Sequence, residues 1–88
     1  MAIVPSAQAH CAKPNGYLPI AAHDGTNWAR GYVYRSNEVA WFSVGQQVYT
    51  SPYNAVWTYA YATSWVNRSG AWVKNTSWHW LSVESVKC

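Results

Sequence analysis

Acidic side chains, which general acid–base chemistry would need, number only three in this chain of 88 residues: Asp24, Glu38 and Glu84. A glycosidase holds two carboxylates about 5 to 9.5 Å apart across the bond that it cleaves. Two of these three carboxylates lie at a turn or at the end of an expected strand. Asp24 directly follows His23, and adjacent side chains on a strand point to opposite faces, so this pair would make a poor proton relay. We therefore predict that the protein is not an enzyme.

The three histidines, His10, His23 and His79, lack the spacing of zinc motifs or other metal motifs. His79 stands between Trp78 and Trp80, where an ordinary packed or surface histidine is the default interpretation. We expect no bound metal and no cofactor.

The two cysteines, Cys11 and Cys88, bracket nearly the whole chain and have no metal-type spacing. A domain of this size buries only about 60% of its unfolded surface, so a cross-link would matter to its stability. In the chain-entropy model, a disulfide over so long a loop contributes about 4.5 kcal/mol. We expect this disulfide, and with it an oxidising, extracellular setting.

The segment Ala7-Gln8-Ala9 has the small-x-small form of a signal-peptidase site. We interpret residues 1–9 as a leader or signal-peptide remnant, with a plain flexible tail as the alternative, and residues 10–88 as a single all-β domain. The chain has no apolar run of about 18 residues. These features predict a secreted protein without a transmembrane segment.

Aromatic side chains are the strongest binding signal, with seven Trp and seven Tyr against 10% charged residues. The aliphatic residues are too few to fill a core alone, so several rings should be buried and about five or six should be surplus. Contiguous exposed aromatic surface usually marks binding, and flat rings stack on the C–H face of a sugar. We predict binding of a glycan or cell-envelope polysaccharide. The candidate residues are the rings Trp57, Tyr59, Tyr61, Trp65, Trp72, Trp78 and Trp80, with Asn67, Arg68 and Asn75 as flanking polar groups.

Other functions remain open. A small cationic β protein rich in Trp could act on bacterial surfaces as an antimicrobial. Gly70-Ala71-Trp72-Val73-Lys74 resembles a stretch of the lactococcin-type β-sandwich bacteriocins, whose pattern is otherwise missing here. Tyr, Trp and Arg also dominate protein-interface hot spots, so an enzyme inhibitor, a complex subunit or a homo-oligomer interface is possible. Nucleic acid is not an expected partner, because the net charge is only +3.

The elements that would position these residues are strands. Residues with β-branched or aromatic side chains outnumber the straight-chain helix formers by more than two to one. Turn signals recur about every 8 to 12 residues, as in an all-β domain. We predict a small antiparallel β-sandwich or barrel of six to seven short strands. The expected strands are residues 17–22, 28–36, 38–44, 46–51, 55–66, 71–74 and 77–86.

The longest expected strand, residues 55–66, alternates large and small side chains, which face opposite sides of a sheet. The large set is Trp57, Tyr59, Tyr61, Thr63 and Trp65, and the small set is Val56, Thr58, Ala60, Ala62, Ser64 and Val66. The alternation does not say which set is buried. For segments 28–35 and 77–83, too, the pattern does not show which set of side chains is buried. If the small set forms the core, a row of rings is exposed.

Overall fold

The computed structural model describes residues 13–21, 27–52 and 56–87, with the side chain of Pro52 left aside. These residues form eight β-strands and one short 3-10 helix, and they contain no α-helix. The elements are β1 (Gly16–Pro19), β2 (Trp28–Val33), β3 (Val39–Ser43), β4 (Gln47–Pro52), β5 (Trp57–Ala62), β6 (Trp65–Val66), β7 (Trp72–Val73), β8 (Ser77–Ser82) and η2 (Val83–Ser85).

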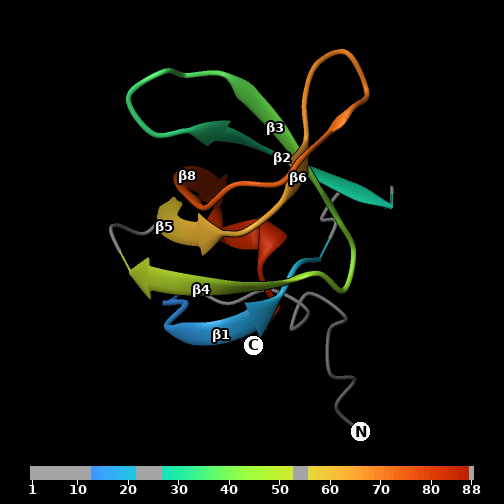
Figure 1. The fold of residues 1–88 in the computed structure, drawn as a ribbon. Coiled ribbons are helices and arrows are strands. Elements are labelled where there is room, and N and C mark those ends of the chain that lie inside the picture. The colour runs from blue at the N-terminus through green and yellow to red at the C-terminus, as the bar shows by residue number, and fades with distance from the viewer. Residues whose placement is uncertain (1–12, 22–26, 53–55, 88) are drawn as a thin grey trace, which may run out of the picture.

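All eight strands belong to one sheet, in the order β1-β4-β5-β8-β2-β3-β6-β7 (Figure 1). Every pairing between neighbouring strands is antiparallel. The sheet is open, because its edge strands β1 and β7 are not hydrogen-bonded to each other. The prediction of an all-β antiparallel fold is confirmed. The prediction of a sandwich or barrel is wrong, because the strands form one continuous ladder that does not close.

The strand count exceeds the predicted six to seven because the expected strand 55–66 is two strands. Pairing stops at Ala62 and resumes at Trp65. The alternation changes phase at this break, since Ala62 and Trp65, three positions apart, are both buried. The sequence pattern runs on without interruption, so it gave no sign of this shift.

One face of the sheet, here called the inner face, carries the core. Its buried hydrophobic cluster is Ile20, Ala29, Ala40, Phe42, Val48, Ala60, Ala62, Trp65, Leu81 and Val86. The sheet curves around this cluster. Trp65 of β6 packs against the imidazole of His79 in β8, with ring centroids 4.5 Å apart, although β2 and β3 lie between those strands. Such a contact across two intervening strands requires strong curvature toward the inner face.

Gly31 in β2 makes part of this curvature possible. A Cβ atom built at Gly31 would lie 2.5 Å from Leu81 Cδ2, 2.8 Å from the Trp80 carbonyl oxygen and 3.0 Å from Phe42 Cε2. Without a side chain at this position, Phe42 of β3 reaches over β2 to the ring of His79, at a centroid distance of 5.0 Å.

Hydrogen bonds at the corners hold the curved sheet together. The side-chain amide of Gln46 donates to the Ser64 carbonyl at 2.7 Å, which joins the β3–β4 corner to the β5–β6 break. The Ile20 amide donates to the Gln46 carbonyl, and the Ala21 amide donates to the Ser85 carbonyl, both at 2.8 Å. The segment after β1 is thereby tied to the β3–β4 corner and to η2.

Cys11, Cys88 and the expected leader, residues 1–9, lie outside the described residues. The disulfide and the leader therefore stay predictions. No helix in the described part of the chain is long and apolar enough to cross a membrane.

Candidate binding surface

The face of the sheet opposite the core carries the rings, and we call it the outer aromatic face. With the exception of Trp65, every Trp and Tyr that the structure describes lies on it: Tyr17, Trp28, Tyr32, Tyr34, Trp41, Tyr49, Trp57, Tyr59, Tyr61, Trp72, Trp78 and Trp80. The expectation that several Trp and Tyr rings form the core is wrong. Aliphatic side chains and threonines, with Phe42, Trp65 and His79, fill the inner face.

The strand register lines up five of these rings, which we call the aromatic row: Tyr17, Tyr49, Tyr61, Trp78 and Tyr34. Tyr17 pairs with Tyr49, Tyr49 with Tyr61, and Tyr61 with Trp78. The Tyr34 amide donates to the Trp78 carbonyl at 2.8 Å, which places Tyr34 next in line. Adjacent strands lie about 4.8 Å apart, so four rings on neighbouring strands and Tyr34, directly after β2, give a row about 19 Å long.

Tyr59 sits beside the aromatic row and packs against three other rings. It stacks on Trp78 with centroids 4.4 Å apart and planes 6° from parallel. It also contacts Trp80 at 5.0 Å and Tyr34 at 5.1 Å. Aromatic pairs contribute about 0.5 to 1.5 kcal/mol beyond their buried area. These rings therefore bury and restrain one another outside the core.

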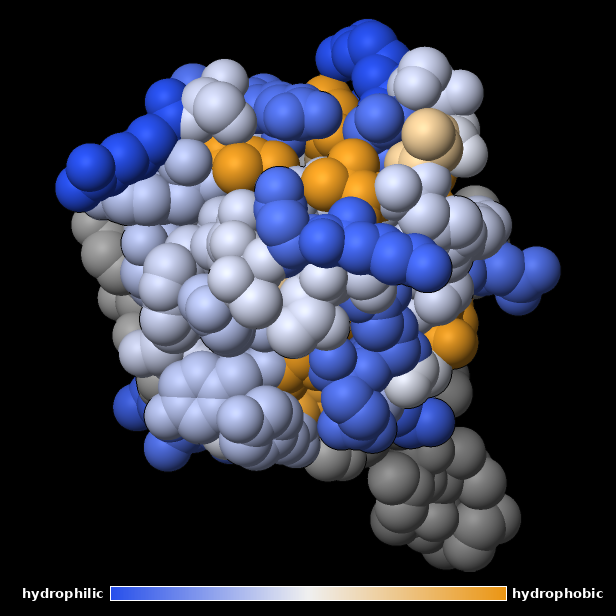
Figure 2. Space-filling view, viewed as in Figure 1, coloured by the Kyte–Doolittle hydropathy of each residue, from blue (hydrophilic) through white to orange (hydrophobic). Residues whose placement is uncertain are grey.

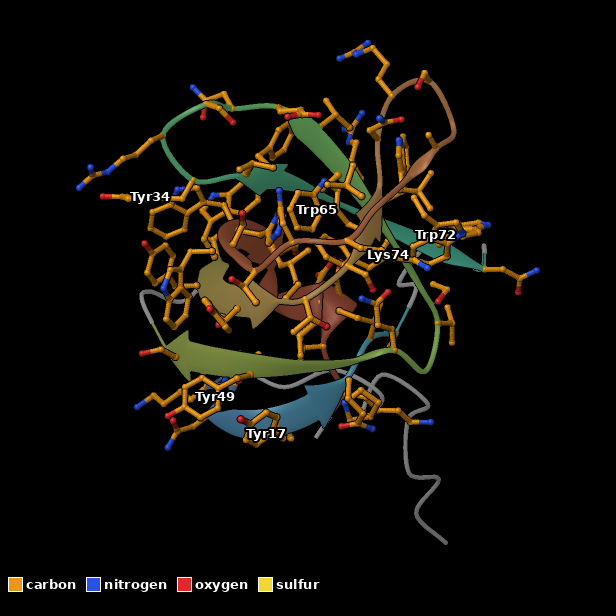
Figure 3. The ribbon with its side chains drawn as sticks, in the orientation of Figure 1. Tyr17, Tyr34, Tyr49, Trp65, Trp72 and Lys74 are labelled. Carbon is orange, nitrogen blue, oxygen red and sulfur yellow. The ribbon has the colours of Figure 1, made fainter. Side chains whose placement is uncertain are left out.

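Several rings of the outer aromatic face still present at least a third of their surface to solvent. Tyr17 is the most exposed at 76%, followed by Trp72 at 50%; Trp28, Tyr34, Tyr49, Trp57 and Tyr61 are also exposed. In Figure 3 Tyr17 and Tyr49 lie beside each other over β1 and β4, whereas Trp65 lies within the molecule. In the view of Figure 2 hydrophobic residues form only small, separated areas. Tyr and Trp each combine an apolar ring with one polar group, so the exposed rings offer an amphipathic surface.

Smaller ring pairs extend the outer aromatic face away from the aromatic row. Trp28 of β2 and Trp72 of β7 have centroids 6.2 Å apart, and Tyr32 and Trp57 have centroids 6.5 Å apart. Trp72 lies near Lys74, on the opposite side of the view from Tyr34 (Figure 3).

Two arginines lie among the rings. The Arg30 guanidinium is 5.8 Å from the ring centroid of Tyr32 and 5.9 Å from that of Trp41, and the Arg35 guanidinium is 5.2 Å from that of Tyr34. Burial raises the pKa of the Tyr59 hydroxyl; Tyr34 adds to this rise and Arg35 opposes it. Tyr59 is therefore a neutral phenol at physiological pH, able to donate and accept hydrogen bonds.

The fold places most of the predicted ring residues on the outer aromatic face. Trp57, Tyr59, Tyr61, Trp78 and Trp80 lie on neighbouring strands β5 and β8, and Trp72 lies across the sheet on β7. Trp65 is the exception. It is 3% exposed, because the break before β6 turns it to the inner face, and it cannot contribute to a surface.

Of the predicted polar candidates, Asn67 and Arg68 lie in the β6–β7 hairpin turn, and Asn75 lies in the connection between β7 and β8, which are not neighbours in the sheet. The Asn67 side-chain oxygen accepts hydrogen bonds from the amides of Ser69 and Ala71, both at 3.0 Å, and from the Ser69 hydroxyl at 2.7 Å. Asn67 thus builds the β6–β7 turn. Arg68 and Asn75 are exposed, and Asn75 accepts from the Ser77 hydroxyl at 3.4 Å.

The sequence prediction missed half of the outer aromatic face: Tyr17, Trp28, Tyr32, Tyr34, Trp41 and Tyr49, together with Arg30. A signal was present in 28–35, where Trp28, Arg30, Tyr32 and Tyr34 occupy alternate positions. The pairing of Tyr17 with Tyr49 and of Arg30 with Trp41 depends on the strand register, which the alternation alone does not give.

No group of three or more His, Cys, Asp or Glu residues that could hold a metal ion lies within 13–21, 27–52 or 56–87. His79 is fully buried, and its ring nitrogens have no hydrogen-bond partner within the described structure. Comparison with known proteins found no matching family model, no matching curated protein and no matching solved structure.

Proposed function

We propose that this protein is a secreted, non-catalytic binding protein that holds a glycan or cell-envelope polysaccharide on its outer aromatic face. The observation that carries the proposal is the aromatic row with its neighbour Tyr59. These rings are neighbours in the strand register and remain partly exposed. Ring contacts join Tyr17 to Tyr49, and Tyr59 to Tyr34 and Trp78, with Tyr61 also in contact with Trp78. Contiguous exposed aromatic surface of this kind marks interaction sites on small proteins.

The chemistry of the rings fits a sugar polymer. A pyranose presents C–H groups on its faces and hydroxyls at its edge, while Tyr and Trp combine an apolar ring with one polar group. A row about 19 Å long offers stacking surface for several consecutive sugar residues. Only 10% of the chain is charged, which favours a polymer recognised mainly through its rings and hydroxyls.

Mutual packing makes the rings suitable for tight binding. Tyr59 is held by Trp78, Trp80 and Tyr34, and Tyr61 by Trp78 at 5.0 Å. A side chain already restrained in the free protein loses less conformational entropy when the ligand arrives. Binding on a pre-arranged row therefore costs less than binding on isolated surface rings.

The test is a binding screen of the oxidised protein against chitin, cellulose, peptidoglycan and a panel of soluble glycans, with tryptophan fluorescence as the readout for soluble ligands. We expect saturable binding that Tyr49→Ala and Tyr61→Ala each weaken at least tenfold. Val44→Ala shortens an exposed side chain that is not one of the rings and should leave affinity within about twofold. Absence of saturable binding across the panel by the folded protein would overturn the proposal.

The same proteins also test two alternative functions, binding of a protein partner and antimicrobial activity. Tyr, Trp and Arg are the residues enriched at protein-interface hot spots, so a protein partner is the second candidate. Pull-down with Tyr61→Ala as the negative control would support it if capture required the ring. Growth inhibition of bacteria by the wild-type protein, with no glycan binding, would instead support the antimicrobial hypothesis.

A further inference from the structure

Arg30 is a charged residue among the rings of the outer aromatic face. It is an exposed residue of β2, paired in register with Trp41 of β3. Its guanidinium lies within 6 Å of the ring centroids of both Tyr32 and Trp41. At this range the ring quadrupoles attract the cation. Contact with a ring face uses none of the N–H groups in hydrogen bonds, so the N–H donors of the guanidinium are available to another partner.

Within residues 13–21, 27–52 and 56–87 no carboxylate forms an ion pair with this cation. Glu38 and Glu84 are the carboxylates within the described residues, and neither pairs with Arg30 or Arg35. Arg35 lies in the turn that follows β2, with its guanidinium 5.2 Å from the ring centroid of Tyr34. The outer aromatic face thus carries two guanidiniums among rings, without a described carboxylate to neutralise them.

We propose that Arg30 binds a carboxylate of an acidic glycan, so that the polymer on the outer aromatic face is a polyuronate. This inference rests on the proposed function. The planar fork of a guanidinium matches the two oxygens of a carboxylate and forms two parallel hydrogen bonds with it. Arg30 takes the acid group of one sugar residue, and the neighbouring rings stack on the sugars beside it.

A nucleic acid is the less favoured polyanion. Surfaces that bind single strands combine stacking rings with a basic groove that follows the phosphates. Here the basic residues beside the rings are few and scattered, with Arg30 and Arg35 at one part of the described face and Lys74 near Trp72, and the net charge of the whole chain is +3. Occasional arginines among many rings suit a polymer whose affinity comes mainly from stacking.

The experiment compares polygalacturonate with the same polymer after full methyl esterification, which removes the charge and keeps the sugar rings. Isothermal titration calorimetry at low salt should give an affinity for the acid form that is at least about tenfold higher than for the ester. This is the gain expected for a charge-assisted hydrogen bond. Arg30→Gln should lower affinity for the acid form to that for the ester, and Arg30→Lys should restore only part of it. Arg68→Gln makes the same charge change in the β6–β7 turn and should leave the preference intact.

Several results would overturn the inference. Equal affinity for the acid and the ester would overturn it. So would binding of a neutral polysaccharide when neither of these two polymers binds. Both outcomes are compatible with the proposed function. An equal loss in Arg68→Gln and Arg30→Gln would show that net charge, and not a site at Arg30, sets the preference. Tighter, Arg30-dependent binding of poly(dT) would make nucleic acid the partner. Failure of every polysaccharide would remove the proposed function as well.

Discussion

The two faces of this sheet are built from the same strands and differ in almost every respect. On β5 the inner face carries Thr58, Ala60 and Ala62, all buried, and the outer aromatic face carries Trp57, Tyr59 and Tyr61. Curvature explains the division. Side chains on the concave face of a curved sheet converge, so alanines and threonines make room there for a few large residues such as Phe42 and Trp65, whereas side chains on the convex face diverge and leave room for many rings. The rings then fill that room by packing on one another.

The comparison separates two kinds of stability. The inner face is a close-packed core, where removed volume leaves a cavity. The outer aromatic face is a set of cross-strand ring pairs, each worth about 1 kcal/mol or less relative to alanine. Substitutions of similar size should therefore have very different effects on the two faces, and this difference can be measured.

The largest effect is expected from Phe42→Ala. Phe42 is fully buried and packs against His79, so its truncation should lower the free energy of unfolding by about 3 to 5 kcal/mol. Urea denaturation measures this directly. Val44→Ala, at a residue 48% exposed, is the control and should change stability by no more than about 0.5 kcal/mol. A loss below about 1 kcal/mol in Phe42→Ala would contradict the assignment of the inner face as the core.

Acid should destabilise the inner face through His79. Burial lowers the pKa of this imidazole from 6.5 to about 4. The unfolded chain therefore binds a proton that the folded chain resists, and stability falls as pH drops from 6.5 to about 4. The expected loss is about 3 kcal/mol.

Urea denaturation at pH 7 and pH 4 tests this prediction, with His79→Phe as the matched variant. Phenylalanine keeps a ring between Phe42 and Trp65 but cannot take up a proton. The difference in stability between the two pH values should shrink by about 3 kcal/mol in this variant. An undiminished difference would assign the acid sensitivity to other groups. Should His79→Phe fail to fold, His79→Leu serves the same purpose.

Gly31→Ala tests the close approach that curvature requires. The added Cβ would lie 2.8 Å from the backbone oxygen of Trp80, which cannot move aside without disturbing β8. Overpacking of this kind costs about 1 to 3 kcal/mol. The double variant Gly31→Ala/Leu81→Ala should not recover the loss, because the clash with the carbonyl remains. Wild-type stability in Gly31→Ala would mean that the strands are less tightly apposed than the structure indicates.

The smallest stability effect is expected on the outer aromatic face. Tyr61→Ala removes a ring that is 36% exposed and contacts Trp78, so its free energy of unfolding should fall by about 1 kcal/mol or less. Its glycan affinity should fall at least tenfold, as proposed above. Thermal unfolding and the binding titration together give both values. A stability loss as large as that of Phe42→Ala would show that the outer rings are a second core and not a binding surface.

The sequence predicted those parts of the candidate site whose residues share a face because they alternate along a single strand. Trp57, Tyr59 and Tyr61 share a face because they occupy alternate positions on one strand. Trp78 and Trp80 do so for the same reason. The inclusion of Trp65 failed at the break between β5 and β6, where two residues outside the ladder reverse the phase of the alternation.

By itself, the sequence determined that the chain is all-β, that turns such as Asn67–Gly70 join its strands, and that large and small side chains alternate along residues 57–62. The tertiary structure alone decided which face is buried, how far the sheet curves and which distant rings become neighbours. Alternation is symmetrical between the two faces, so local residues cannot choose between them. The choice depends on the space available on each side of the curved sheet, and on a register that joins Tyr17 to Tyr49 and Tyr61 to Trp78.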